Sequence, residues 1–205
     1  MLYGIILFIL SRMFKRTDEL KAELSRKSIH MLIALVPVLA AMSRSHTALL
    51  LMGGTLLYAW AEGMRFLGFN PPLISCITAR VLRRREEGRF AFAPVTLGLG
   101  ALLPLLLFPP KAAAAAIYAL AFGDSASTMV GKFLGRLRPA FLSGKSIEGS
   151  LACFAASTLA CFLVFHDWKT AVIVGVVSVA VDAVPLKEFD NLLIPLAAGF
   201  TAALL

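Results

Sequence analysis

The chain has 205 residues, of which 59% are hydrophobic, and its mean hydropathy is +0.84. Soluble domains are only about half apolar, so this composition excludes a soluble globular protein and predicts an all-α, polytopic integral membrane bundle. The formal net charge of +8 suits contacts with anionic lipid head groups and with anionic substrates, and it does not imply nucleic acid as a partner.

Apolar runs recur along the whole chain and predict one membrane-embedded catalytic domain, residues 1–205, with about eight transmembrane helices. The runs are Leu2–Met13, Ile29–Met42, Ala48–Ala61, Ala93–Phe108, Ala112–Phe122, Leu151–Phe165, Ala171–Leu186 and Leu192–Leu205. Several are shorter than the roughly 20 residues that span a bilayer, so flanking residues must extend them or the bundle must be thin. The first run lacks a preceding basic region and a following small-residue cleavage site, so we expect a retained helix there.

The distribution of basic residues predicts the orientation of this bundle. With eight crossings, the loops on one side contain only Arg44, Lys111 and Lys169 as basic residues. The other side is crowded with Lys and Arg, so we expect it to be cytoplasmic, with both termini on the opposite side. The expected cytoplasmic loops lie near 14–29, 62–92, 123–148 and 187–191. This side also collects nearly all acidic residues, which suits a functional site better than a simple lipid anchor.

Two charged groups lie where the second apolar run begins and the third ends. Arg26 and Lys27 precede His30, and Arg26 and His30 are one helical turn apart. A phosphate-facing role and structural ion pairing both remain open for this group. For Glu62 and Arg65, which close the third run, a structural ion pair is the conservative interpretation.

The segment 122–150 is the most polar stretch between apolar runs. Its carboxylates, ammonium groups, hydroxyls and glycines are the groups that hold a phosphate and a divalent cation. Asp124 is expected at the cytoplasmic end of a helix, where an unpaired carboxylate is costly. One explanation is capping of the amides of Ser127 and Thr128. The other is a role as metal ligand or general base, which Gly123 and Gly131 favour because they leave room for a ligand.

Farther along this segment, Lys132 lies within two turns of Asp124 and is a candidate for neutralising phosphate charge. Gly131 and Gly135 are four residues apart, as are Lys132 and Arg136. The glycine spacing is explained equally well by close helix packing and by a phosphate contact.

The tripeptide Gly144-Lys145-Ser146 ends like a P-loop, but Pro139 occupies the position of a required glycine and no strand precedes it. We therefore exclude that motif. Ser146 is predicted to cap the next helix, and Lys145 with free amides forms a candidate anion site. The carboxylate of Glu148 beside phosphates makes sense mainly where a cation such as Mg²⁺ bridges them.

The last two runs also contain acidic residues. Asp182 lies inside an apolar run, where it cannot cap a helix, so it needs a basic or metal partner from another helix. Asp190 and Asn191 open the final run. For Asp190, an N-cap is as good an explanation as a metal ligand.

Four motifs in this order resemble the CTP-dependent polyprenol kinase family, which includes dolichol kinase, phytol kinase and CTP-dependent diacylglycerol kinase. They are Arg-Lys-x-x-His (26–30), Phe-Gly-Asp-x-x-Ala/Ser-x-x-x-Gly-Lys-x-x-Gly-Arg (122–136), Gly-Lys-Ser-x-Glu-Gly-Ser (144–150) and Asp-Asn-Leu-x-x-Pro (190–195). The resemblance implies transfer of the γ-phosphate of CTP, or of another nucleoside triphosphate, to the hydroxyl of a polyprenol, a phytol-like alcohol or diacylglycerol. It also implies a divalent cation, Mg²⁺ or Ca²⁺.

The resemblance implies that Arg26, Lys27, Asp124 and Gly131 are needed for activity and that Lys145, Ser146, Glu148, Asp190 and Asn191 belong to the nucleotide and metal site. Together with the residue patterns, this gives the expected catalytic residues Asp124, Lys132 and Lys145. The expected nucleotide or phosphate site comprises Arg26, Lys27, Gly123, Ser127, Gly131, Gly144, Ser146 and Asn191. The expected metal ligands are Asp124, Glu148 and Asp190, with His30, Glu62, Arg65, Arg136 and Asp182 in support.

Two rival functions are weighed against the kinase. A cytidylyltransferase-like enzyme would make a CDP-lipid, but the long signature near the end of such enzymes is absent. A small ion-coupled transporter would show several acids at mid-membrane and often an inverted repeat, whereas only Asp182 approaches that depth and no repeat is visible. No oligomeric state is predicted.

Overall fold

The computed structural model describes residues 23–69, 90–142, 144–184 and 189–205, and every regular element in these ranges is helical. The all-α class is thus confirmed for this part of the chain. The first elements are a helix Glu23–Met42 that contains a 3-10 turn (Ile33–Leu35) and α2 (Val36–Met42), then α3 (Arg44–Phe66), α5 (Ala93–Leu107) and α6 (Pro110–Tyr118). They are followed by a π-helical turn (Ala119–Asp124), α7 (Ser125–Phe133), a second 3-10 turn (Ala140–Leu142), α8 (Ile147–Phe165), α9 (Trp168–Asp182) and α10 (Asp190–Leu204).

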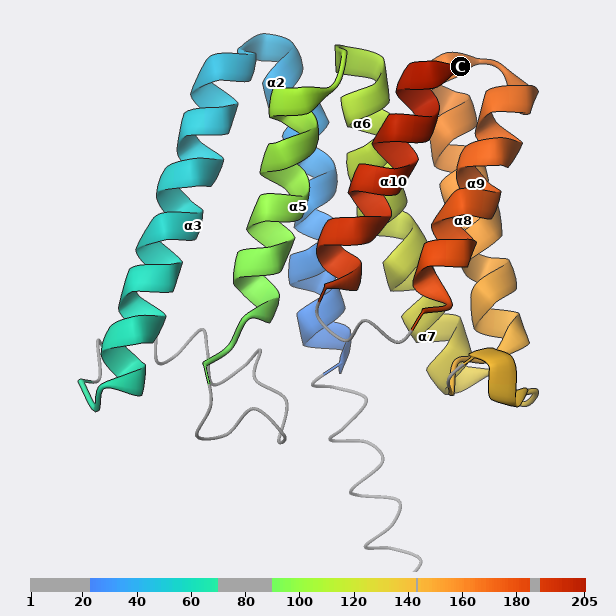
Figure 1. Cartoon of the computed structure of the whole chain (residues 1–205), viewed down its shortest axis with the longest axis horizontal. Helices are drawn as coiled ribbons and strands as arrows, with labels where there is room; N and C mark the ends of the chain where they lie inside the picture. Colours follow the sequence, from blue (N-terminus) through green and yellow to red (C-terminus); the bar gives the residue numbers. More distant parts are fainter. Residues whose placement is uncertain (1–22, 70–89, 143, 185–188) are drawn as a thin grey trace, which may run out of the picture.

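The described residues form seven helical rods, because α6, the π-helical turn and α7 are continuous. Figure 1 shows the rods side by side, with the C-terminus at the end opposite α7. Within the described ranges, three helices are long and apolar enough to cross a membrane, Glu23–Met42, Pro110–Phe133 and Ile147–Phe165, and α5 and α10 are shorter apolar helices. The count of eight is not confirmed, and the expected first helix lies outside the described residues.

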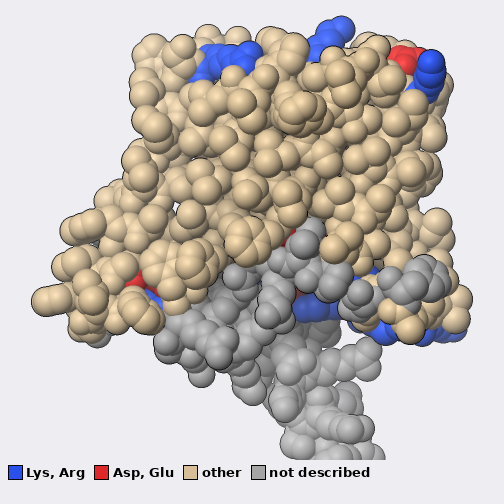
Figure 2. All heavy atoms as spheres, in the orientation of Figure 1, with Lys and Arg blue, Asp and Glu red and all other residues tan. Residues whose placement is uncertain are grey.

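The surface of the bundle agrees with a membrane protein. Figure 2 shows that Lys, Arg, Asp and Glu gather toward the two ends of the helices, while uncharged residues cover the band between them. Large apolar side chains on α3 are widely exposed, such as Leu50 at 74% and Leu56 at 63%. Such surface is stable when it faces lipid chains.

Small residues let the helices of the core approach closely. Ala112, Ala113, Ala115 and Ala116 of α6 are almost completely buried, and α6 packs against α5, α8 and α10. The rod that begins with α6 therefore lies at the centre of the bundle, and it brings the polar residues that follow it to the centre as well.

The helix expected to end at Phe122 continues to Phe133 through the π-helical turn, so the prediction of a helix end next to Asp124 is wrong. The reason lies in contacts between this rod and neighbouring helices. The polar side chains of Asp124 and Ser127 bind groups on neighbouring helices, so the backbone need not leave the helical path to satisfy them.

Two glycines bring α7 against α8. A Cβ atom on Gly149 would lie 2.7 Å from the carbonyl oxygen of Ser127 and 3.1 Å from Cα of Gly131. A Cβ atom on Gly131 would in turn lie 3.7 Å from Cα of Gly149. The packing explanation for Gly131 thus has direct structural support.

This packing predicts that Gly149→Ala lowers thermal stability, because overpacking a close helix contact costs about 1–3 kcal/mol. Gly54→Ala on α3 is the matched control, since nothing lies within 4 Å of a Cβ atom there. Alanine is favoured over glycine in a helix by about 0.5–1 kcal/mol, so the control should unfold at the same or a higher temperature. Thermal unfolding of both variants in detergent measures the difference. Equal unfolding temperatures for the two variants would contradict the prediction.

Candidate active site

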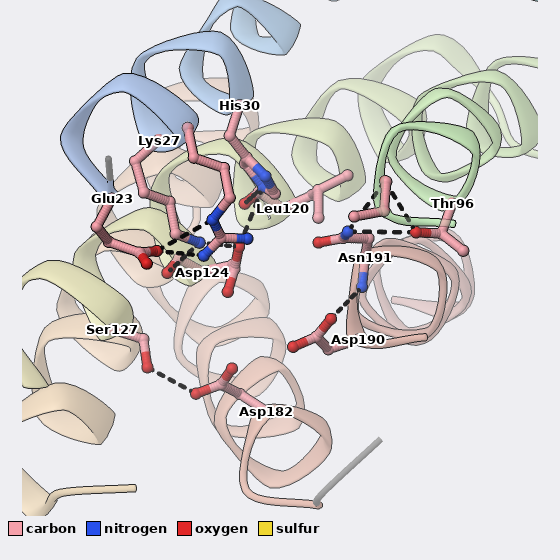
Figure 3. Close-up of polar contacts among 12 residues, drawn as sticks. Glu23, Lys27, His30, Thr96, Leu120, Asp124, Ser127, Asp182, Asp190 and Asn191 are labelled. Atoms are coloured by element: carbon pink, nitrogen blue, oxygen red, sulfur yellow. Dashed lines mark hydrogen bonds and ion pairs between the residues drawn. The ribbon is translucent and has the colours of Figure 1, made fainter. Parts of the chain in front are cut away.

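Asp124 is the centre of a buried group of charged residues contributed by two helices (Figure 3). Lys27 Nζ lies 2.5 Å from Asp124 Oδ2 and 3.3 Å from the backbone oxygen of Asp124. His30 Nε2 lies 3.2 Å from the same Oδ2 atom. All three side chains are nearly inaccessible. Asp124 makes no capping hydrogen bond to α7, so the explanation that it caps Ser127 and Thr128 is wrong.

The π-helical turn supplies a second acceptor for His30. His30 Nε2 lies 3.1 Å from the carbonyl oxygen of Leu120, which belongs to this turn. Both neighbours of Nε2 are acceptors, so this nitrogen carries the ring proton. The imidazole thereby fixes the helix Glu23–Met42 against the turn from which Asp124 projects. Single π-helical turns within α-helices are frequent at functional sites.

Asp182, at the end of α9, is completely buried and is bound by one residue of α7 and one residue of the loop before α8. Lys145 Nζ lies 2.5 Å from Asp182 Oδ1, and Ser127 Oγ donates to Asp182 Oδ2 at 2.7 Å. A basic or metal partner was predicted from another helix; the partner is basic, but Lys145 lies in the loop before α8 and not in a helix.

Asp124, Asp182 and Asp190 each place one carboxylate oxygen within 4.8 Å of the others. Figure 3 shows the three carboxyl groups directed toward a common space, from three different rods. Asp190 accepts the backbone amide of Asn191 at 2.9 Å and does not occupy the N-cap position, which belongs to Phe189. The N-cap explanation for Asp190 is therefore wrong.

This carboxylate trio (Asp124, Asp182 and Asp190) has the chemistry of a hard-cation site. Mg²⁺ and Ca²⁺ bind oxygen ligands at about 2.0–2.6 Å, so ligands on opposite sides of one ion are about 4–5 Å apart. The separations within the trio fall inside that limit. The trio contains two of the three expected metal ligands, and Asp182 replaces Glu148 as the third.

Glu148 lies in a different environment. Its carboxylate accepts the backbone amides of Arg136 at 3.0 Å and Leu137 at 3.2 Å, and it is not part of the trio. It thus holds the chain between α7 and α8, and the structure does not bring it to the other expected metal ligands. The only described contact of Arg136 at this site is this backbone amide.

Arg26 and Lys132, both expected to bind phosphate, share one acidic partner. Glu23 Oε2 lies 2.5 Å from Lys132 Nζ, and Glu23 Oε1 accepts from Arg26 Nε at 3.1 Å and also from its Nη2. Sequence reasoning missed Glu23, although Glu23, Lys27 and His30 are spaced i, i+4 and i+7, which places them on one face of a helix.

Other expected site residues contribute to packing. A Cβ atom on Gly123 would overlap Ser157 of α8, so the space expected for a ligand beside Gly123 is filled. Ser146 caps α8 as predicted, with Oγ accepting the Gly149 amide at 3.1 Å. Asn191 Nδ2 lies 3.3 Å from Thr96 Oγ1 and joins α10 to α5.

The loop before α8 is held by a residue that was not predicted. Arg138 donates to the carbonyl oxygens of Gly144 and Gly131, each at 2.6 Å. It thus satisfies a carbonyl in the last turn of α7. Gly144 itself has φ of +91°, a conformation that favours glycine, and a Cβ atom there would meet nothing within 4 Å.

Glu62 and Arg65 form the expected ion pair. Arg65 Nη2 lies 2.6 Å from Glu62 Oε1, and the same oxygen accepts the amide of Ala91 at 2.8 Å. Glu62 is completely buried. The pair fixes the end of α3 to the segment that leads into α5, and it is separate from the trio.

Fold and site together define a helical membrane protein with a buried carboxylate and ammonium centre at one end of its rods. CTP-dependent diacylglycerol kinase 1 of Schizosaccharomyces pombe is 25% identical over 153 residues, which cover 73% of this chain and 70% of the relative. Dolichol kinase of Saccharomyces cerevisiae is 28% identical over 160 residues, 76% of this chain but 30% of that protein. Both support membership of the CTP-dependent polyprenol kinase family. No family model and no solved structure matches the chain.

Proposed function

We propose that the protein is a lipid-alcohol kinase that transfers the γ-phosphate of CTP, or of another nucleoside triphosphate, to the hydroxyl of a polyprenol such as dolichol, a phytol-like alcohol or diacylglycerol. The observation that carries this proposal is the trio beside Lys27 and Lys145, because phosphoryl transfer needs carboxylates for a cation and fixed positive charges for phosphate oxygens. The two relatives, kinases by name, support the same reaction class.

We further propose that the reaction takes place at the cytoplasmic face of the membrane. The trio lies at the end of the rods that also carries Arg26, Lys132 and Lys145. Arg44, Lys111 and Lys169 lie at the opposite end, where α3, α6 and α9 begin. A soluble nucleotide reaches the end with the trio directly. A lipid alcohol reaches it from the bilayer with its hydroxyl at head-group depth, between helices whose outer surfaces are apolar.

A divalent cation, Mg²⁺ or Ca²⁺, would be held by Asp124, Asp182 and Asp190, and it would neutralise charge on the β- and γ-phosphates. Lys27 and Lys145, each within 2.5 Å of a trio carboxylate, lie where they can bind phosphate oxygens. Positioning and charge neutralisation provide most of the catalysis in such a reaction.

The acceptor hydroxyl must lose a proton as its oxygen bonds to the γ-phosphorus and the bond from that phosphorus to the β-phosphate oxygen breaks. Lys27 and His30 already bind Asp124, and Lys145 and Ser127 bind Asp182. Among the described contacts, Asp190 accepts only the amide of Asn191. We assign Asp190 as the carboxylate that accepts the hydroxyl proton, through the oxygen that would not hold the cation.

Radiolabelled transfer tests the proposal. The purified protein is incubated with Mg²⁺, with lipid alcohols of the three classes or with phosphatidic acid as the acceptor for the rival reaction, and with CTP labelled at either the γ- or the α-phosphate. Appearance of γ-label in the lipid supports a kinase. Appearance of α-label in the lipid, with γ-label in pyrophosphate, would establish the rival CDP-lipid synthesis, and absence of label in every lipid would refute both. Unlabelled ATP as competitor identifies the preferred nucleotide.

A further inference from the structure

Glu23 binds two cations that come from different helices. Arg26 lies one turn along the same helix, whereas Lys132 lies 109 positions away, near the end of α7. The side chain of Glu23 is 9% exposed and the side chain of Arg26 is 12% exposed, but the side chain of Lys132 is 52% exposed. One end of this bridge is therefore fixed in the protein, and the other is open to solvent.

Glu23 differs from the other acidic residues nearby. Lys27 and Lys145 bind carboxylates that belong to the trio. A cation bound there would neutralise these carboxylates in place of the two lysines. Glu23 is not a member of the trio, so a cation bound by the three aspartates would leave the Glu23 bridge intact.

A carboxylate and a phosphate compete for the same donors. Both accept hydrogen bonds from a guanidinium in a bidentate arrangement and from an ammonium group, at similar distances. Arg26 Nε and Nη2 already bind one oxygen of Glu23, and Lys132 Nζ binds the other. A phosphate group that binds Arg26 and Lys132 therefore competes with Glu23 for these donors.

We propose that Glu23 is an internal competitor of the nucleotide: its carboxylate occupies Arg26 and Lys132 in the empty protein and is displaced from them when a triphosphate binds. The inference rests on the proposed kinase function. Displacement leaves a carboxylate with little exposure and without a cation, which opposes nucleotide binding. The same competition assists departure of the nucleoside diphosphate, whose fewer phosphate charges compete less well.

Glu23→Gln tests this inference, because it removes the competing charge with little change in size. Isothermal titration of the full chain in detergent with CTP and Mg²⁺, without lipid acceptor, measures affinity directly. We expect the variant to bind CTP about tenfold more tightly than the wild type, since a charge-assisted competitor is lost. A residue that only stabilises the fold, or one that binds the cation, would weaken CTP binding or leave it unchanged when replaced, and either result would overturn the inference.

Three further variants sharpen the test. Glu62→Gln removes another buried carboxylate paired with an arginine at i+3, outside the trio, and should not tighten CTP binding. In a Lys132→Met background, the gain from Glu23→Gln should shrink, because one of the two released cations is gone. Glu23→Asp shortens the side chain by one methylene and should give a smaller gain in CTP affinity than Glu23→Gln. This variant replaces Glu23→Gln in the test if the glutamine variant is unstable. Failure of the folded wild type to bind CTP and ATP alike would overturn the proposed kinase function itself.

Discussion

Asp124→Asn should reduce phosphate transfer by about 100- to 1000-fold or more, because the reaction loses a charge that holds the cation and orients Lys27. The same substitution should lower stability. Lys27, with 4% of its side chain exposed, would be left as a buried cation without its carboxylate, and removal of one partner from a buried ion pair costs about 3–5 kcal/mol. Initial rates of γ-label transfer and thermal unfolding in detergent measure the two effects.

The double variant Asp124→Asn with Lys27→Met separates catalysis from folding. Removal of both charges relieves the penalty of the unpaired lysine, so the unfolding temperature should recover toward that of the wild type. Transfer should stay as low as in the single variant. Recovery of activity together with stability would show that the pair is only structural, and near-normal activity in either variant would remove Asp124 from the reaction.

Asp182→Asn should act chiefly on the requirement for the divalent cation. Asp182 is completely buried and contributes one oxygen to the trio. Loss of its charge should raise the Mg²⁺ concentration for half-maximal transfer by about 100-fold, because even partners of metal ligands contribute about 10- to 100-fold to metal affinity. A titration of Mg²⁺ at saturating CTP measures this shift, and excess Mg²⁺ should restore part of the rate.

Asp167→Ala is the matched control at the other end of α9. Asp167 caps α9 and accepts the amide of Thr170 at 2.8 Å. Loss of an N-cap costs about 0.5–2 kcal/mol, so the control should unfold at a lower temperature yet keep the wild-type Mg²⁺ dependence. An equal shift in Mg²⁺ dependence for both variants would show that Asp182 acts through stability alone.

Much of the site could be predicted from the sequence because intramembrane charges are rare and costly. Asp182 cannot cap a helix at its position, so a partner from elsewhere was required, and Lys145 provides it. Ser146 could be predicted as a cap from its place before an apolar run. The Glu62 and Arg65 pair followed from helical spacing alone. These predictions depend on local geometry, which the sequence specifies.

The pairing between distant segments could not be predicted. Glu148 was grouped with Lys145 because the two are neighbours in sequence, but backbone amides of the preceding loop bind its carboxylate and Asp182 binds the lysine. Lys132 was assigned to phosphate without its partner Glu23, which is 109 positions away. Such pairs depend on how the rods pack, and apolar runs specify the rods without specifying their neighbours.

The π-helical turn Ala119–Asp124 divides the central rod into two halves, and it lets each half have its own rotation about the helix axis. In an α-helix each residue adds about 100° of rotation, and a π-helical turn accommodates roughly one extra residue. The alanine-rich half can therefore keep the orientation that suits its packing, while the half that begins at Asp124 takes the orientation that suits its charges. In this stretch, one residue gained or lost is equivalent to a rotation of the site, so length matters here as much as identity.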